Sequence, residues 1–290
     1  MMQKATTIFL IFITVLTGCN KTEEKIIPGN TPPPDPTQPA SLRGNFIIKS
    51  YIGLLGRESS DEEYNEAKTA LDNNNFDKNS RKTVVSSILE KNDFYSREFE
   101  IARINLLNGL DTLQIRDFIN TFEYLLTLPS FEEQWPLIQT ELDRIYPLQN
   151  SVQDLISGNA SISAVHKRCL YNNFYDEINM GSLNFVIACF QNLLLRNPTA
   201  YESEQGVLMV DGFNALLFLE SGQSKSDFLD IFIESDDYYE GQVQLLFNRF
   251  LFRAPNSEEM TTYSELYKNS GNYKSLISEI LSTDEYAGLK

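Results

Sequence analysis

The chain has 290 residues and a formal net charge of -16, because 40 aspartates and glutamates outweigh 24 lysines and arginines. This acidity argues against nucleic-acid binding and against adsorption onto anionic lipid, since both carry phosphates that would be repelled. His166 is the only histidine, which excludes a multi-histidine metal site, and no motif typical of a nucleotide or covalent haem site occurs. We therefore expect no cofactor.

Residues 1–18 predict a secretory signal peptide. A start that contains Lys4 leads into an apolar run at residues 8–13 and a small-residue end, and the segment is too short for a comfortable membrane span. It closes with Leu16-Thr17-Gly18-Cys19, which resembles the lipobox of bacterial lipoproteins. The resemblance implies cleavage before Cys19, lipidation of its thiol and acylation of the new amine, and hence attachment to a membrane through lipid.

Residues 19–45 are predicted to form the lipid anchor and an extended tether. Six prolines lie between positions 28 and 39, a density that favours polyproline geometry and prevents a packed core. Glu23 and Glu24 look like the short export tags that send some lipoproteins to the outer face of the outer membrane. The expected location is therefore the outer membrane at the cell surface, with its periplasmic face as the alternative.

The rest of the chain predicts helices. Val84, Val85, Ile88 and Leu89 follow the three-and-four spacing of an amphipathic helix, and the same spacing recurs over residues 115–126. Polar breaks rich in asparagine and glycine separate such segments. We therefore expect an all-α fold in which helical repeats pack into one domain, elongated or compact.

A repeated pattern divides the helical part. Residues 51–63 align without a gap with residues 247–259, arginine on arginine and acidic pair on acidic pair, and a third copy lies at residues 190–199. Matched endings with apolar, acidic and aromatic residues follow the copies at 88–95, 232–239 and 280–287. The predicted units are repeat 1 at 46–100, a helical connecting region at 101–184, repeat 2 at 185–242 and repeat 3 at 243–290.

The pattern of an apolar helix, a Leu55-Gly56-Arg57 turn, an acidic helix start and an acidic-aromatic ending resembles a known domain. It is a domain of unknown function that recurs in bacterial secreted and surface proteins and is itself similar to phycobilisome linker domains. The middle copy departs from the pattern at residues 196–198 and in an insert around 207–219. The resemblance implies assembly or attachment at a surface and brings no catalytic residues.

Arg57, Arg196 and Arg253, one in each repeat, allow two interpretations. As partner contacts they would suit an interface, where arginine is favoured. As structural residues they would bond helix-end carbonyls or the acidic residue that closes their own repeat, which is Asp93, Asp237 or Asp284. Repetition favours the structural interpretation, because a structural part must recur with every unit. Asp61 and Ser257 are expected to cap the helix that follows the turn.

Few residues suggest catalysis. His166 and Cys169 are three apart and share a helix face, but two ligands are too few for a closed zinc site, so a surface histidine is expected. Cys169 and Cys189 could form one disulfide or stay free. Cys189 lies among apolar residues, where packing is the favoured role.

Residues 174–180 form a polar-aromatic patch that helical spacing does not explain. Aromatic rings beside acids and amides can hold a sugar or a peptide. The candidate ligand residues are Phe174, Tyr175, Asp176, Glu177 and Asn179. A simple loop between helices is the favoured alternative.

Two functions remain open. The first is a non-catalytic envelope lipoprotein, held in the membrane through Cys19, that acts as an interaction or assembly module and docks another envelope protein. The second is a glycan-binding or glycan-cleaving surface lipoprotein, which for cleavage needs a cleft with two carboxylates about 5–10 Å apart. Nothing in the sequence selects such a pair, so docking is favoured, with no catalytic residue and no metal.

Overall fold

The computed structural model describes residues 38–289. The predicted signal peptide, the lipidated Cys19 and most of the predicted tether lie outside these residues. Helix α2 (Gln38–Leu55) begins inside the stretch assigned to the tether, so residues 38–45 are helical.

Helices make up nearly all the regular structure of residues 38–289, which confirms the all-α prediction. After α2 come α3 (Asp61–Asn73), α4 (Lys78–Leu89) and α5 (Asn92–Leu106). The connecting region holds α6 (Thr112–Leu125), a 3-10 turn η1 (Pro129–Gln134), α7 (Trp135–Gln149), α8 (Ser151–Ser157), α9 (Ile162–Leu170) and α10 (Asn173–Ile178). None of the helices described is both long and apolar enough to cross a membrane.

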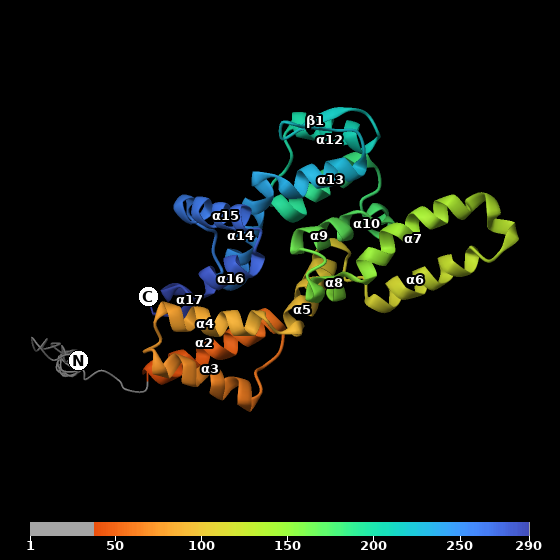
Figure 1. Cartoon of the computed structure of the whole chain (residues 1–290). Helices are drawn as coiled ribbons and strands as arrows, with labels where there is room; N and C mark the ends of the chain where they lie inside the picture. The colour runs from red at the N-terminus through yellow and green to blue at the C-terminus, as the bar shows by residue number, and fades with distance from the viewer. Residues whose placement is uncertain (1–37, 290) are drawn as a thin grey trace, which may run out of the picture. The chain divides into compact units, whose positions relative to one another are not determined.

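The C-terminal part continues with α11 (Ser182–Cys189), the π-helical turn η2 (Phe190–Leu194) and α12 (Ala200–Val210). The insert after α12 forms a small antiparallel hairpin of β1 (Ala215–Leu217) and β2 (Glu220–Gly222). The chain ends with α13 (Lys225–Glu234), α14 (Asp236–Phe250), α15 (Ser257–Ser270), α16 (Tyr273–Leu281) and α17 (Asp284–Ala287). Figure 1 shows their arrangement.

Side-chain caps set where the helices of the repeats begin. Ser60 caps α3 and Asn256 caps α15, each by accepting a hydrogen bond from the backbone N–H three residues later. The prediction of Asp61 and Ser257 as caps was therefore wrong by one residue. A capping residue needs extended backbone, and the acidic residues after it belong to the first helical turn, where the helix dipole favours them.

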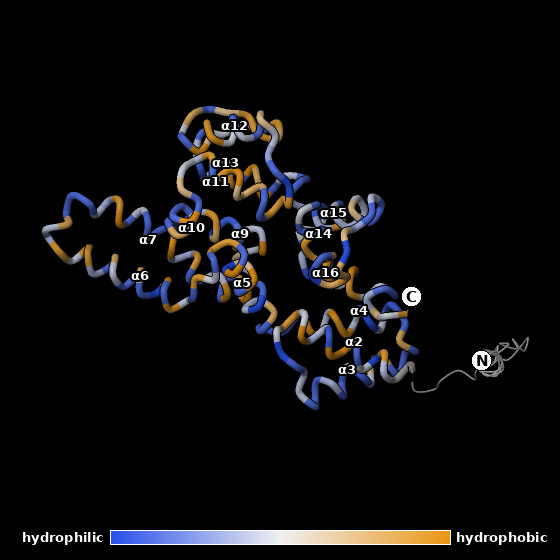
Figure 2. Tube along the Cα trace, turned by 180° about the vertical axis from the view of Figure 1, so that it is seen from behind, coloured by the Kyte–Doolittle hydropathy of each residue, from blue (hydrophilic) through white to orange (hydrophobic). Residues whose placement is uncertain are grey.

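The core joins the first and third repeats. The ring centre of Phe46 in α2 lies 5.5 Å from that of Phe76 and 5.7 Å from that of Tyr286 in α17. The ring of Tyr286 also packs on that of Phe250 in α14. Each such ring removed from water contributes about 1.5–3 kcal/mol. Along most helices hydrophobic and hydrophilic stretches alternate, as expected when one face of each helix is buried (Figure 2).

Equivalent helices of repeats 1 and 3, α4 and α16, pack on each other. The hydroxyl oxygens of Ser86 in α4 and Ser278 in α16 lie 3.2 Å apart. These two serines occupy the same position when the endings at 88–95 and 280–287 are aligned, so equivalent residues of the two repeats meet here. Arg81, almost fully buried in α4, donates to the carbonyl oxygen of Ser282 at 3.0 Å and so holds the same interface.

The π-helical turn η2 lies very close to the first half of α14. A Cβ atom placed on Gly241 of α14 would lie 2.1 Å from the carbonyl oxygen of Leu193 in η2. Only glycine permits this approach of two backbones. The contact fixes the position of η2, and with it one wall of the site described below.

Candidate functional site

Arg57 is bound entirely within repeat 1. Its Nε lies 2.7 Å from Asp93, its Nη1 donates to the carbonyl oxygen of Glu58 at 2.9 Å, and Nη1 and Nη2 hold both carboxylate oxygens of Glu63 at 2.8 and 3.0 Å. Glu63 in turn completes a capping box, because it also accepts from the backbone N–H of Ser60.

Arg196 repeats this arrangement in repeat 2. Its Nε lies 2.7 Å from Asp237, Nη1 donates to the carbonyl oxygen of Asn197 at 3.2 Å, and Nη1 and Nη2 hold Glu202 at 2.9 and 2.6 Å. Glu202 forms the capping box with Thr199. The departure from the motif at residues 196–198 therefore leaves the arginine cluster intact.

Arg253 completes the set in repeat 3. Nη1 donates to the carbonyl oxygen of Ala254 at 3.0 Å, and Nη1 and Nη2 hold Glu259, which forms the capping box with Asn256. Nε and Nη2 bind Glu285 at 2.7 and 2.6 Å. We call each arginine with its two carboxylates an arginine clamp.

The carboxylate that closes the third clamp differs from the predicted one. Arg57 and Arg196 meet Asp93 and Asp237, as expected, whereas Arg253 meets Glu285 instead of Asp284. In each clamp the closing acid is the second residue of the following helix, and in α17 that residue is Glu285. Asp284 binds Arg81 across the interface between repeats 1 and 3, at 2.5 Å.

The residue before each clamp arginine has left-handed backbone, which aims the guanidinium back at the next helix. These residues are Gly56, Leu195 and Phe252, with φ of 70°, 55° and 56°. Left-handed backbone costs a residue with a Cβ atom about 1–2 kcal/mol relative to glycine. Leu195 and Phe252 therefore hold an unfavourable conformation that Gly56 holds at no such cost.

The clamps keep their carboxylates ionised. Hydrogen bonds from Arg196 are the chief reason that the pKa of Glu202 falls to about 2. Arg57 likewise holds the pKa of Glu63 well below its usual range. The three guanidiniums are thus engaged inside the fold, and the residues free to meet a partner or ligand lie elsewhere.

The predicted ligand patch forms helix α10, and most of its side chains make contacts within the fold. Tyr175 is fully buried, Phe174 packs on Phe118 with ring centres 4.9 Å apart, and Asp176 is ion-paired with Lys225. Asn179 donates its amide N–H to the carbonyl oxygen of residue 175. Glu177 is exposed. The five side chains do not converge on a common space.

Both cysteines within the described residues are free and buried. Burial raises the pKa of the Cys169 thiol to about 12 and raises that of Cys189 further. Because the thiolate is the reactive form, neither cysteine is suited to nucleophilic or redox chemistry at neutral pH. The packing role predicted for Cys189 agrees with its complete burial.

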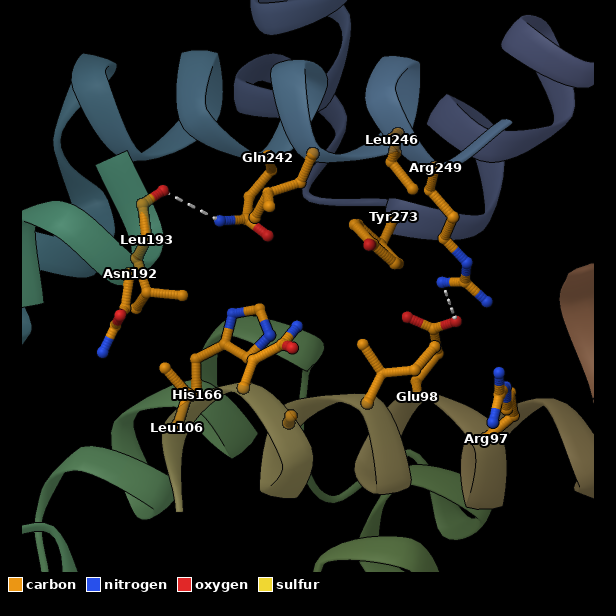
Figure 3. A pocket seen from close by; sticks show the side chains of 14 residues that line it. Arg97, Glu98, Leu106, His166, Asn192, Leu193, Gln242, Leu246, Arg249 and Tyr273 are labelled. Atoms are coloured by element: carbon orange, nitrogen blue, oxygen red, sulfur yellow. Dashed lines mark hydrogen bonds and ion pairs between the residues drawn. The ribbon is translucent and has the colours of Figure 1, made fainter. Parts of the chain in front are cut away.

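A cavity of about 310 Å³ lies between α5, α9, η2, α14 and α16 (Figure 3). We call it the central cavity. Its apolar walls include Ala102 and Leu106 of α5, Leu193 of η2 and Leu246 of α14. Its volume is at the lower end of the range of about 300–1,000 Å³ for small-molecule sites.

One end of the central cavity is polar and uncharged. His166 of α9 lies here, with its Nδ1 2.9 Å from the hydroxyl oxygen of Tyr238. Gln242 of α14 is 1 % exposed and donates its amide N–H to the carbonyl oxygen of Leu193 at 3.4 Å. Figure 3 shows the amide oxygen of Gln242 pointing into the cavity above the His166 ring.

The other end of the central cavity carries charges that cancel. Arg249 of α14 donates to Glu98 of α5 at 2.8 Å and to the carbonyl oxygen of Gly53 at 2.6 Å. Glu98 is only 6 % exposed, so this pair is largely removed from water. Arg97, on the same wall, is paired with Glu100 at 2.6 Å. Tyr273 of α16 lies between the two ends.

His166 was expected at the surface, but it is only partly exposed. His166 faces the central cavity, and burial lowers the pKa of its imidazole to about 4. The ring is therefore neutral at physiological pH. Helical spacing carried a signal for this, because His166 shares the face of α9 that buries Ile162, Cys169 and Leu170. The elements that cover the ring, α14 and η2, lie far along the chain.

Acidification from pH 6.5 to pH 4 is expected to destabilise the protein by up to about 2 kcal/mol through His166. In this window the unfolded chain binds a proton on the imidazole and the folded chain does not, so the free energy of unfolding falls with pH. This destabilisation is smaller than the full pKa shift implies, because the imidazole ring is partly accessible to solvent. Since His166 is the only histidine, its 1H–13C resonance can be titrated directly. A midpoint near 6.5 would contradict the assignment, and His166→Gln should remove this part of the pH dependence.

A second feature is a groove of about 620 Å³ between α2, the end of α14 and α17. Three exposed apolar side chains line it, Ile48 at 44 %, Ile52 at 46 % and Phe252 at 88 % exposure. Lys49 also lines the groove, with its Nζ 4.0 Å from the ring centre of Tyr286, and burial lowers its pKa. No carboxylate among residues 38–289 pairs with Lys49. We call this feature the apolar groove.

No match was found when the chain was compared with protein-family models, curated proteins and solved structures. The resemblance to lipoproteins and to linker-like domains stays an expectation from sequence motifs.

The described residues hold no group of three or more acidic, histidine or cysteine side chains placed to bind a metal ion. The central cavity has one carboxylate in its lining, that of Glu98, and it is committed to Arg249. The pair of carboxylates that glycoside cleavage needs does not line this cavity.

Proposed function

We propose that this protein is a non-catalytic lipoprotein of the cell envelope, anchored in the outer membrane through Cys19, that acts as an interaction module for another envelope protein. The observation that carries the proposal is the apolar groove, where Ile48, Ile52 and Phe252 are exposed side by side around a concave surface. Exposed apolar side chains grouped around a groove are typical of protein-binding sites.

Phe252 supports docking at the apolar groove more strongly than any other single residue does. Its ring is 88 % exposed, so packing within the fold does not compensate for its left-handed backbone. The equivalent residue of repeat 1 is Gly56, which adopts the same conformation without strain. Strained residues of this kind are concentrated at functional sites, and an exposed aromatic ring is a common anchor of an interface.

The chemistry of the apolar groove defines its partner. The three apolar side chains are complementary to apolar side chains of a partner. The unpaired ammonium of Lys49 is complementary to a carboxylate of the partner. Arg249 and Glu285 also line the groove, but they are paired with Glu98 and Arg253. The partner we propose is an envelope protein with a segment that carries apolar side chains beside an aspartate or glutamate.

Photo-cross-linking in intact cells tests this function. A photoreactive amino acid at Ile48 is expected to capture one envelope protein in stoichiometric yield. The matched control is the same amino acid at Leu137 of α7, which is 66 % exposed but lies outside the groove. Phe252→Gly should reduce the captured fraction at least about tenfold, as expected for an interface anchor, while raising the free energy of unfolding by about 1 kcal/mol.

The opposed effects on binding and stability separate a docking role from a structural one. Lys49→Glu should also abolish capture, because it places a carboxylate against that of the partner, and Cys19→Ser should release the protein from the membrane fraction. Equal capture from Ile48 and Leu137, capture of a second copy of this chain, or unchanged capture by Phe252→Gly would each overturn the proposal.

The alternative, a glycan-binding surface lipoprotein, draws its support from the central cavity instead of residues 174–180. Binding is favoured over cleavage, because the only carboxylate in the cavity lining is paired with Arg249. This site is separate from the apolar groove, although Arg249 lines both.

A further inference from the structure

We propose that the central cavity binds one neutral, hydroxyl-rich ligand of the size of a single sugar ring. The proposal concerns a different site from the apolar groove and does not depend on the docking function. It rests on the volume of the cavity, on the cancellation of its charges and on the polar atoms that face it.

Volume and wall chemistry set the size and shape of the ligand. About 310 Å³ admits one small ring and excludes an extended oligosaccharide. Leu106, Leu193 and Leu246 offer apolar contacts, and the ring of Tyr273 lies between the two polar ends. A sugar ring fits such walls because its C–H faces are apolar while its hydroxyl groups project from the rim.

The charges around the central cavity favour a neutral ligand. Glu98 neutralises Arg249 at 2.8 Å, and Glu100 neutralises Arg97 at 2.6 Å. The Tyr273 hydroxyl stays protonated, since burial and the nearby Glu98 raise its pKa, and the His166 imidazole is neutral. A charged ligand would lose its hydration without gaining an unpaired counter-charge, which is unfavourable in a buried site.

Two neutral polar groups are placed to bind hydroxyls. The amide oxygen of Gln242 accepts no hydrogen bond from residues 38–289 and points into the cavity (Figure 3). His166 uses Nδ1 toward Tyr238, so Nε2 is the ring nitrogen without a partner among these residues. Asn105 adds a side-chain amide to the lining. A hydroxyl both donates and accepts, so it can satisfy these groups together.

The test uses the full-length chain, labelled with 13C at histidine, and follows the single His166 resonance. The probes are D-glucose, D-galactose, D-mannose and N-acetyl-D-glucosamine, compared with D-glucuronate and D-glucosamine as charged counterparts. At least one neutral sugar is expected to shift the resonance saturably, and its charged counterpart to bind at least about tenfold more weakly, since burying an uncompensated charge costs more than 1.4 kcal/mol.

Two variants examine the site itself. Gln242→Leu removes the amide oxygen and should weaken binding at least about tenfold. Ala102→Leu fills the cavity without removing a polar group and should abolish binding while the spectrum stays that of a folded protein. Phe252→Gly, which changes only the apolar groove, should bind the sugar unchanged, so failure of the docking function and failure of this site are distinguishable.

Three results would overturn the proposal. In the first, none of the neutral sugars moves the His166 resonance. In the second, a charged sugar binds more tightly than its neutral counterpart. In the third, Ala102→Leu, or a folded Gln242→Leu, binds as tightly as the unchanged chain.

Discussion

Gly241→Ala is expected to lower the free energy of unfolding by about 3 kcal/mol, although alanine is the better helix former. Gly241 lies inside α14, and its added Cβ would sit 2.1 Å from the backbone oxygen of Leu193. Because the obstacle is backbone, α14 and η2 would have to move apart, and the central cavity between them would change shape. Urea denaturation of both proteins measures the effect.

Gly44→Ala is the matched control for this substitution. Gly44 also lies inside a helix, but the atom nearest to its added Cβ is the hydroxyl oxygen of Tyr64 at 3.0 Å, the tip of a flexible side chain. This variant should keep the stability of the unchanged chain or gain up to about 1 kcal/mol. Similar stabilities for the two variants would mean that α14 and η2 are not in such close contact.

Arg196→Ala is expected to cost about 2 kcal/mol, the second of the large effects. Without the guanidinium, Glu202 and Asp237 face each other with no cation between them, and Thr199 loses the oriented carboxylate of its capping box. The value lies between those of exposed and buried ion pairs because Arg196 is 34 % exposed. Thermal or urea unfolding near pH 7 measures it.

The pH dependence of the same variant identifies the cause. The pKa of Glu202 is about 2 in the folded protein and 4.5 by its ordinary value, so the stability from this carboxylate is present above pH 4.5 and is lost as pH falls toward 2. Arg196→Ala should lose this dependence. Arg57→Ala, whose partner Asp93 is more exposed, should cost less. Equal costs for the two arginines would show that burial does not set the strength of the clamps.

The sequence predicted the clamp arginines because the aligned copies conserve spacing as well as residue type. Asp93 and Asp237 were identified by matching the endings, whereas Asp284 was chosen for its residue type although Glu285 occupies the matching position. Glu63 and Glu259 were expected in the acidic first turn of the next helix but not as partners of the arginine, and Glu202 was not identified. A signal for them was present, since each stands three residues after a serine, threonine or asparagine at a helix start.

The central cavity could not be predicted from local spacing. Arg249 and Glu98 are 151 residues apart and come from different repeats, and nothing in either helix indicates the other. His166 was placed on the surface because His166 and Cys169 are too few ligands for a zinc site, although Ile162, Cys169 and Leu170 on the same face of α9 are buried. Periodicity tells which face of a helix is buried, but which helices meet depends on the packing of the whole chain.

The pairing of α4 with α16 has a consequence for the order of assembly. Ser86 and Ser278 are 192 residues apart, so their contact closes a loop that contains most of the helical chain. Long-range closure is slow compared with the formation of local helices. The face of α4 that packs on α16 therefore stays uncovered until α16 has been synthesised. A chaperone that assists the folding of this chain would bind that exposed face of α4.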